Sequence, residues 1–285
     1  MSATAGLDGV TRIAIQGEAG SNSHRAALQA MQRTADAASI EIFPCASSAD
    51  VFDALEQRRV EAAVLPIENS LHGSVAEHFD LLLEHSVCVV GETTLHIQHN
   101  VIAAPGVPLE DVREIWSHPV ALSQCRQWLR SHPTLRATPT YDTAGSVKLL
   151  MEAGRRDVAG LAPELAAAEY GAEVILAGVE DHAENFTRFF VLERLGRESV
   201  EEADKASLAF SVAHRPGTLL AALATFREAG LNLTKIESRP VHGRPWEYVF
   251  FVDVRFEHKT ELDAALAGLR TQCDMVKVLG LYCAA

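Results

Sequence analysis

The chain has 285 residues, of which 48% are hydrophobic, and it carries a formal net charge of -13 at pH 7. This length is enough for two compact domains. The acidic balance argues against partners such as nucleic acid or an anionic membrane surface, and it requires any site for an acidic ligand to be built from local groups.

The sequence holds no run of about 18 apolar residues that would predict a membrane span, and residues 1–12 contain no apolar core of a signal peptide. The five cysteines form no CxxC pair. We therefore expect no disulfide framework and no metal site, but reduced, mostly buried thiols in a cytoplasmic protein.

Strand-like and helix-like patterns alternate from the start of the chain to residue 192. The predicted strands span residues 11–16, 40–44, 60–66, 87–97, 100–103, 114–117, 137–141, 158–161, 173–176 and 189–192. The predicted helices span residues 23–37, 49–58, 74–84, 120–130, 144–153 and 164–169. This alternation predicts an α/β fold with parallel sheets whose faces are covered by helices.

The pattern changes after a charged stretch over residues 196–205, which reads as a solvated linker. Four further strands are predicted over residues 207–213, 231–238, 247–256 and 275–282, and two helices over residues 217–229 and 260–271. Thr260 is the expected N-cap of the last helix. The order βαββαβ is the ferredoxin-like arrangement.

A glycine turn over residues 17–24 joins the first predicted strand to the first helix. Glycines allow tight backbone turns, and free N–H groups at a helix start can bind an anion, with Ser21 and Ser23 as hydroxyl donors. From this segment alone we favour the alternative of a turn with an N-cap serine. The spacing matches neither GxGxxG nor a P-loop, so nucleotide binding is poorly supported.

Polar side chains follow several other predicted strands, where open α/β sheets bind ligands. Glu68, Asn69 and Ser70 come directly after an apolar strand, and they read equally well as ligand-binding groups or as a polar loop whose serine caps the next helix. Ser117 ends another strand, and Gln124 lies on the helix after it. Their side chains are therefore candidates for the same site.

Two further junctions carry candidates. Thr143 lies at the start of a predicted helix, where Asp142 or Thr143 itself is most simply the N-cap. Thr187 and Arg188 precede an apolar strand, and an arginine among aromatic residues needs a partner, which is either a ligand carboxylate or a structural Asp or Glu. No Ser/His/Asp arrangement and no metal-spaced cluster emerges.

Four motifs occur in an order that resembles the prephenate dehydratase family over about residues 11–283. They are PIENS at residues 66–70, SHPxALxQC at residues 117–125, TRF at residues 187–189 and ESRP at residues 237–240. The resemblance implies a two-lobed catalytic domain of the type II periplasmic-binding-protein architecture, followed by a ferredoxin-like ACT domain. No helical chorismate mutase segment precedes Thr11, so the chain resembles the monofunctional members of the family.

The implied boundaries are residues 10–195 for the catalytic domain, 196–205 for the linker and 206–285 for the ACT domain. Within the catalytic domain, one lobe would comprise about residues 10–97 and 178–195, and the other about residues 98–177.

The resemblance also implies roles for individual residues. Thr187 matches the family's principal catalytic residue, and the other active-site polar residues would be Glu68, Asn69, Ser117 and Gln124. The substrate-binding residues would be Ser21, Ser23, Ser70, Thr143 and Arg188. The phenylalanine-binding residues would be Pro216, Gly217, Thr218, Leu219, Glu237, Ser238, Arg239 and Pro240.

The chain departs from the family pattern at three places. The family often has Thr-Phe where this chain has Ser21-Asn22, glutamine where Val120 stands, and alanine where Thr218 stands. The first departure changes the contacts of the glycine turn, and the last one bears on effector affinity.

The expected reaction is the decarboxylating dehydration of prephenate to phenylpyruvate, with L-phenylalanine as allosteric effector. Formation of an aromatic ring drives this reaction, so no cofactor is expected. We also expect a homodimer or homotetramer. The rival hypotheses are an arogenate dehydratase, which uses the aminated substrate, and a non-catalytic amino-acid sensor.

Overall fold

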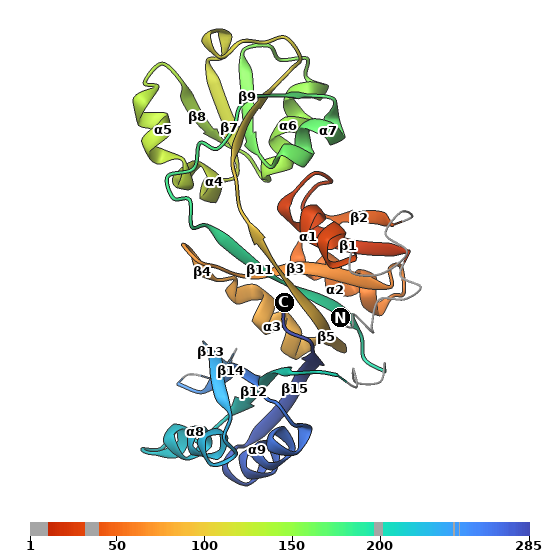
Figure 1. Cartoon of the computed structure of the whole chain (residues 1–285), viewed down its shortest axis with the longest axis vertical. Coiled ribbons are helices and arrows are strands. Elements are labelled where there is room, and N and C mark those ends of the chain that lie inside the picture. Colours follow the sequence, from red (N-terminus) through yellow and green to blue (C-terminus); the bar gives the residue numbers. More distant parts are fainter. Residues whose placement is uncertain (1–10, 32–39, 197–201, 242, 245) are drawn as a thin grey trace.

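The computed structural model describes residues 11–31, 40–196, 202–241, 243–244 and 246–285. They form three parts stacked along the long axis of the molecule (Figure 1). Residues 100–176 form the part at one end, which we call lobe 2, and residues 202–285 form the C-terminal domain at the other end. Lobe 1 lies between them and contains both early residues and the segment 186–196.

Lobe 1 is built on a sheet with the strand order β5-β11-β3-β1-β2. The strands are β1 (Arg12–Gln16), β2 (Glu41–Cys45), β3 (Ala62–Asn69), β5 (Val87–His96) and β11 (Phe186–Arg194), with the short β4 (Gly73–Ser74) paired to β3. Helix α1 (Asn22–Met31) packs on one face, and α2 (Ser48–Glu56) and α3 (Ala76–Glu84) pack on the other. β11 runs antiparallel to both β3 and β5.

Lobe 2 is built on a second sheet with the order β10-β6-β9-β7-β8. Its strands are β6 (Asn100–Ala103), β7 (Glu114–Ser117), β8 (Arg136–Pro139), β9 (Val158–Ala162) and β10 (Glu173–Leu176). Its helices are α4 (Pro119–Gln124), α5 (Arg126–Ser131), α6 (Thr143–Glu152) and α7 (Glu164–Tyr170), with a 3-10 turn at Leu109–Asp111.

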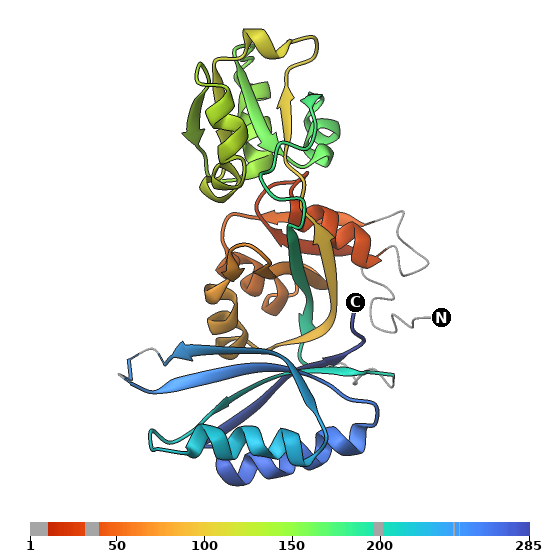
Figure 2. The same ribbon diagram turned by 60° about the vertical axis from the view of Figure 1, so that its left-hand side comes forward.

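The C-terminal domain has the predicted order βαββαβ. Its elements are β12 (Lys205–Ser211), α8 (Thr218–Glu228), β13 (Asn232–Pro240), β14 (Tyr248–Arg255), α9 (Lys259–Gln272) and β15 (Met275–Tyr282). Both helices pack on one face of its sheet, and the other face is turned toward lobe 1 (Figure 2).

This architecture confirms the predicted α/β class and the ferredoxin-like order, but the sheets are mixed rather than parallel. β6 pairs antiparallel with β9 and β10, and β11 returns antiparallel from lobe 2 to lobe 1. The domain and lobe boundaries drawn from the sequence stay predictions.

Two helix predictions differ from the structure, and a third is tested only in part. The helix expected over residues 120–130 is interrupted at Cys125, where Asp181 donates its N–H to the Gln124 carbonyl and accepts from the N–H of Gln127. The last helix starts before Thr260, so its N-cap is His258, whose N–H donates to Glu261. The first helix is seen to Met31, and the rest of its predicted span lies outside the described residues.

The C-terminal domain joins lobe 1 through its sheet. β15 pairs in parallel with β5 at Gly280 and Val89, so one sheet runs through both parts. Phe251 packs on Phe79 with ring centroids 4.9 Å apart, and Tyr282 lies edge-on to Phe190. Within the described residues, no helix is long and apolar enough to cross a membrane.

Gly280→Ala tests this junction. A Cβ at position 280 would lie 2.0 Å from the carbonyl oxygen of Val89, which is main chain and cannot turn aside. We expect the substitution to lower stability by about 1–3 kcal/mol, seen as a fall of several degrees in the apparent melting temperature.

Gly91→Ala is the matched control, because Gly91 lies on β5, the strand of lobe 1 with which Gly280 pairs. A Cβ there meets Val191 at an ordinary 3.8 Å, so the variant should melt like the wild type. Equal melting of all three proteins would contradict the importance of the close approach at Gly280.

Candidate active site

Asn69 and Thr187 meet at paired positions of β3 and β11. The Asn69 side-chain amide donates to the Thr187 hydroxyl over 2.9 Å and to the Asn185 side-chain carbonyl over 2.7 Å. Its own carbonyl oxygen accepts from the N–H groups of Leu71 and His72. Because the Thr187 oxygen already accepts a hydrogen bond, its proton is left to donate to another group, and within the described residues it has no acceptor.

The surroundings of Thr187 are largely buried. Thr187 is 9% exposed and Asn185 is fully buried. The Nδ2 of Asn185 has no hydrogen-bond partner among the described residues, although a buried amide normally has one. The Asn185 amide is therefore an unpaired buried donor two residues from Thr187.

Lobe 2 contributes Gln124, which binds a residue of the loop after Asn69. The Gln124 amide donates to His72 Nδ1 over 3.0 Å, and its carbonyl lies 2.7 Å from His99 Nε2. Burial lowers the pKa of His99, which favours the neutral ring that donates from Nε2. Gln124 therefore reaches from lobe 2 to the loop that follows Asn69 in lobe 1.

The glycine turn of lobe 1 also touches lobe 2. Tyr170 donates to the carbonyl of Ala19, and both Tyr141 and Lys148 bind the carboxylate of Glu18. Gly20 has φ 82°, and a Cβ there would lie 2.8 Å from the Cα of Ala166. Glycine is thus required here both by backbone geometry and by the closeness of lobe 2.

The predicted serine and threonine residues of the site make different contacts. Ser21 is buried and its hydroxyl accepts from the N–H of His24 at the start of α1, as the N-cap alternative expected. Ser23 is buried on α1, and Thr143 opens α6. Ser70 accepts from the N–H of Phe186 and so holds the segment that leads into Thr187.

Ser117 does not join the group around Thr187. It is fully buried in lobe 2, and its hydroxyl donates to the carbonyl of Leu161 over 2.6 Å. Ser117 therefore links β7 to β9 by a side-chain hydrogen bond. Its assignment to the active site stays a prediction that these contacts do not support.

Glu68 and Arg188 point away from Asn69 and Thr187. The predicted strands ended at Pro66 and began at Phe189, whereas β3 extends to Asn69 and β11 begins at Phe186. Successive side chains of a strand face opposite sides of the sheet. Thr187 therefore lies on the face covered by α1, and Arg188 lies on the face turned toward the C-terminal domain.

On that second face Arg188 has three structural carboxylate partners, the alternative left open by the sequence. It lies 2.7 Å from Glu68, 3.2 Å from Glu92, and it also binds Asp253 of the C-terminal domain. Burial by itself lowers the pKa of Arg188, but Asp253 and the other carboxylates raise that pKa well above its usual range. Arg188 is thus permanently charged and paired with three protein carboxylates.

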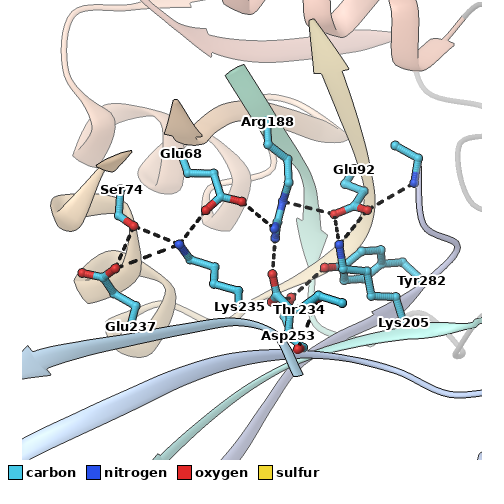
Figure 3. A network of polar contacts seen from close by, with 12 residues as sticks. Glu68, Ser74, Glu92, Arg188, Lys205, Thr234, Lys235, Glu237, Asp253 and Tyr282 are labelled. Atoms are coloured by element: carbon cyan, nitrogen blue, oxygen red, sulfur yellow. Dashed lines mark hydrogen bonds and ion pairs between the residues drawn. The ribbon is translucent and has the colours of Figure 1, made fainter. Parts of the chain in front are cut away.

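Two lysines of the C-terminal domain complete the cluster. Lys235 donates to Glu68 over 2.6 Å, and Lys205 donates to both oxygens of Glu92 over 2.9 Å. Lys205 was expected in a solvated linker, but it is only 7% exposed because Glu92 pairs with it inside the domain junction. We call the six residues Glu68, Glu92, Arg188, Lys205, Lys235 and Asp253 the interdomain charge network (Figure 3).

The predicted effector residues divide between the two faces of the C-terminal sheet. Gly217, Thr218 and Leu219 line a hollow of about 230 Å³ on the helix-bearing face, together with Trp246, Tyr248 and Phe250. Pro216 immediately precedes these residues, and Ser238 and Pro240 pair with Phe250 and Tyr248.

Glu237 and Arg239 face lobe 1 instead. Glu237 accepts from the hydroxyl of Ser74, and Arg239 binds Asp80 over 2.8 Å. Their contacts in this chain are therefore with lobe 1, on the sheet face opposite the hollow.

The candidate site lies on strands of lobe 1 and is reached from lobe 2, and a ferredoxin-like domain follows. This is the arrangement of a two-domain enzyme with a separate regulatory module. Residues 13–197 match the prephenate dehydratase family, and residues 206–265 match the ACT domain family. The chain therefore belongs to the prephenate dehydratase family, whose members are carbon–oxygen lyases. The predicted two-lobed fold with a C-terminal ACT domain is confirmed.

The relatives of this chain carry several names. It is 37% identical to arogenate dehydratase/prephenate dehydratase 2 of Arabidopsis thaliana, over 95% of this chain and 72% of that protein. A prephenate dehydratase of Arthrobacter aurescens in complex with L-Phe superposes with a TM-score of 0.85 and 29% identity, over 96% of this chain and 90% of that one. A structure described as a quorum-quenching acylase, GqqA, has a TM-score of 0.86 and 32% identity, over 96% and 98% of the two chains.

Asn185, His72 and His99 received no role from the sequence. The signal for Asn185 was its position two residues before Thr187, which in a strand is the same face. His72 and His99 carried no local signal, because their partner Gln124 lies 52 and 25 residues away in the chain.

Asn69→Asp removes the donor of Asn69 and keeps its acceptor. The carboxylate still accepts from Leu71 and His72, but it no longer donates to Thr187 or to the carbonyl oxygens of Asn185 and Phe186. We expect a loss of about 1–3 kcal/mol in stability, because the buried Asn185 carbonyl loses its donor, and a fall of about tenfold or more in kcat, measured by urea unfolding and by product formation.

Asn69→Ala is the companion variant, since it removes the acceptor as well and should cost about 1–3 kcal/mol. Wild-type turnover in Asn69→Asp would show that the contact with Thr187 is not needed.

The interdomain charge network predicts a pH-dependent stability. Burial raises the pKa of Glu68, but the hydrogen bond from Lys235 and the charge of Arg188 outweigh burial and leave that pKa below its usual 4.5. Ionised Glu68 therefore stabilises the fold above pH 4.5, and this contribution is lost as the pH falls through the lowered value.

The measurement is urea unfolding of wild type and Glu68→Gln from about pH 7 down to about pH 3. The wild type should be more stable at the upper end, and the two proteins should converge below pH 4.5. A constant difference over the whole range would contradict the assignment of this pairing to ionised Glu68.

Proposed function

We propose that this protein converts prephenate to phenylpyruvate, carbon dioxide and water, and that L-phenylalanine controls the reaction through the C-terminal domain. The observation that carries the proposal is the arrangement at Thr187. Its oxygen accepts from Asn69, so its proton is oriented away from Asn69 and is free for a leaving oxygen.

The chemistry requires little more than such a donor. The bond between the ring carbon and its carboxylate breaks, its electron pair completes the aromatic ring, and the ring hydroxyl leaves from the opposite carbon. A proton from solvent converts the leaving hydroxide to water. A hydrogen bond from Thr187 stabilises the negative charge that develops on the departing oxygen, because threonine is too weak an acid to transfer its proton fully.

The substrate carries two carboxylates, and the charged residues nearest Thr187 in sequence are not available to them. Arg188 is paired with three carboxylates on the other face of the sheet. The start of α1 remains, because α1 packs on the same face as Thr187, and its N–H groups and the hydroxyls of Ser21 and Ser23 suit an anion.

Arogenate is the second candidate substrate, because the Arabidopsis relative is named for both activities. It differs from prephenate by an amino group in place of a keto oxygen. A direct comparison of kcat/KM on the two acids decides between them.

Acylase chemistry is not favoured by this geometry. An acylase that used Thr187 as its nucleophile would need a base to accept its proton. Among the described residues, the only side-chain hydrogen bond of Thr187 comes from the amide of Asn69, which is a donor and not a base.

Support for the effector comes from the C-terminal domain. The Arthrobacter aurescens structure contains L-Phe. In this chain the hollow beside Gly217 and Thr218 is lined by the aromatic side chains of Trp246, Tyr248 and Phe250. The homodimer or homotetramer and the cytoplasmic location stay predictions.

The experiment is the rate of product formation from prephenate and from arogenate, each with and without L-phenylalanine. We expect turnover of prephenate that phenylalanine suppresses. Absence of turnover on both acids by folded protein would overturn the enzymatic proposal, and turnover without a response would overturn the effector proposal alone.

Thr187→Val tests the role of the hydroxyl. Valine keeps the shape of threonine and removes the donor, and the loss of one well-placed donor typically lowers kcat about a hundredfold. We expect that loss with little change in melting temperature, whereas Thr187→Ser keeps the hydroxyl and should retain most activity. Near-wild-type kcat in the valine variant would exclude this role.

A further inference from the structure

The C-terminal domain binds Glu68 and Arg188, whose side chains lie on the opposite face of the sheet from Asn69 and Thr187. In the register of β3 and β11, Asn69 is opposite Thr187, and Glu68 is opposite Arg188. The first pair faces α1 and the second faces the C-terminal domain. Asn69 and Thr187 cannot shift without moving Glu68 and Arg188, because each neighbour is one peptide unit away on the same strand.

Each member of the second pair is bound by one residue of the C-terminal domain. Lys235 of β13 binds Glu68 and also donates to Ser74 over 2.9 Å. Asp253 of β14 binds Arg188, and its other oxygen accepts from Ser207 over 2.6 Å. Figure 3 shows these side chains reaching across from the C-terminal sheet to β3 and β11.

The six residues carry no net charge, since three carboxylates face three cations, and Glu237 adds a further carboxylate 4.0 Å from Lys235. The side chains of Lys235 and Asp253 are 9% and 5% exposed, and that of Glu68 is 31% exposed. A buried charge that loses its partner must find another one or draw water in. The network therefore has one favourable register, and a displacement of the C-terminal sheet is passed on to β3 and β11.

We propose that Lys235 and Asp253 are positioning residues of the active site, which hold Asn69 and Thr187 in register through Glu68 and Arg188, and that the C-terminal domain controls turnover by this route. The inference rests on the proposed function and names the residues that couple its two domains. A displacement of about an ångström at a catalytic group can lower the rate by about a hundredfold, so small movements are sufficient.

Lys235→Met removes the charge and keeps the length of the side chain. We expect kcat to fall about tenfold to a hundredfold with KM changed less, and L-phenylalanine to bind in calorimetry but no longer to alter turnover. Lys235→Arg keeps the charge and should restore most of kcat. Wild-type kcat and wild-type inhibition in Lys235→Met would overturn the proposal.

Lys277→Met is the matched control. Lys277 also crosses from the C-terminal domain to lobe 1, where it donates to the carbonyls of Leu82, Leu83 and His85 at the end of α3. Within the described residues its side-chain hydrogen bonds go only to these three carbonyls, so its loss should lower the melting temperature and leave kcat and inhibition as in the wild type. An equal loss of kcat in both methionine variants would mean that any loosening of the domains lowers turnover, and it would overturn the proposal.

The double variant Glu68→Gln/Lys235→Met separates positioning from direct contact with substrate. If Lys235 acts through Glu68, the fold-reductions in kcat of the two single variants do not multiply. The double variant then has the kcat of the less active single variant. Losses that multiply would show that the two residues act independently and would contradict the proposal.

Hydrogen exchange makes the inference independent of the reaction. In Lys235→Met, the amides of residues 67–70 and 186–190 should exchange faster than in the wild type, and in Lys277→Met they should not. This result can be obtained even if neither prephenate nor arogenate is a substrate. Failure of the proposed function and failure of the positioning role are thus distinguishable, and unchanged exchange in Lys235→Met would count against the latter.

Discussion

The structure of the site depends on a β-bulge in β3. The register of β3 with β11 shifts between Arg188 and Phe189, so that Ile67 is the extra residue. Pro66 has no N–H to donate to the ladder, and proline within a sheet is found at edges and bulges. Without the extra residue, Glu68 would share the face of Val64 and α1, and Asn69 would face the C-terminal domain. The bulge therefore exchanges the faces on which Glu68 and Asn69 lie. Bulges beside functional sites commonly redirect side chains in this way.

The same exchange explains why so many charges are buried at the domain junction. Glu68 and Arg188 are turned onto a face that the C-terminal sheet covers, so both need partners from that sheet. Ion pairs at such a junction contribute little net stability, because desolvation opposes their attraction. The apolar contacts of Phe79, Phe251 and Tyr282 hold the domains together, and the ion pairs select one register among those that apolar packing would tolerate.

Much of the fold followed from local patterns in the sequence. Strand and helix alternation predicted the elements of both lobes, and the order βαββαβ predicted the C-terminal domain. The candidate site was harder to predict. The sequence analysis assigned Glu68 and Asn69, and likewise Thr187 and Arg188, to one site because they are neighbours in sequence. Strands that continue through both pairs place the neighbours on opposite faces, and the partners of the outward pair lie 167 and 65 residues away, beyond any local signal.

Strand β13 connects the two halves of the proposed regulation. Its alternate residues face opposite sides, so Ser238 and Pro240 lie toward the hollow beside Gly217, whereas Lys235, Glu237 and Arg239 contact lobe 1. A strand is stiff along its length because its backbone is hydrogen-bonded to its neighbour. A ligand that moves the outer face of β13 therefore moves Lys235 with it, and Lys235 is bound to the residue next to Asn69.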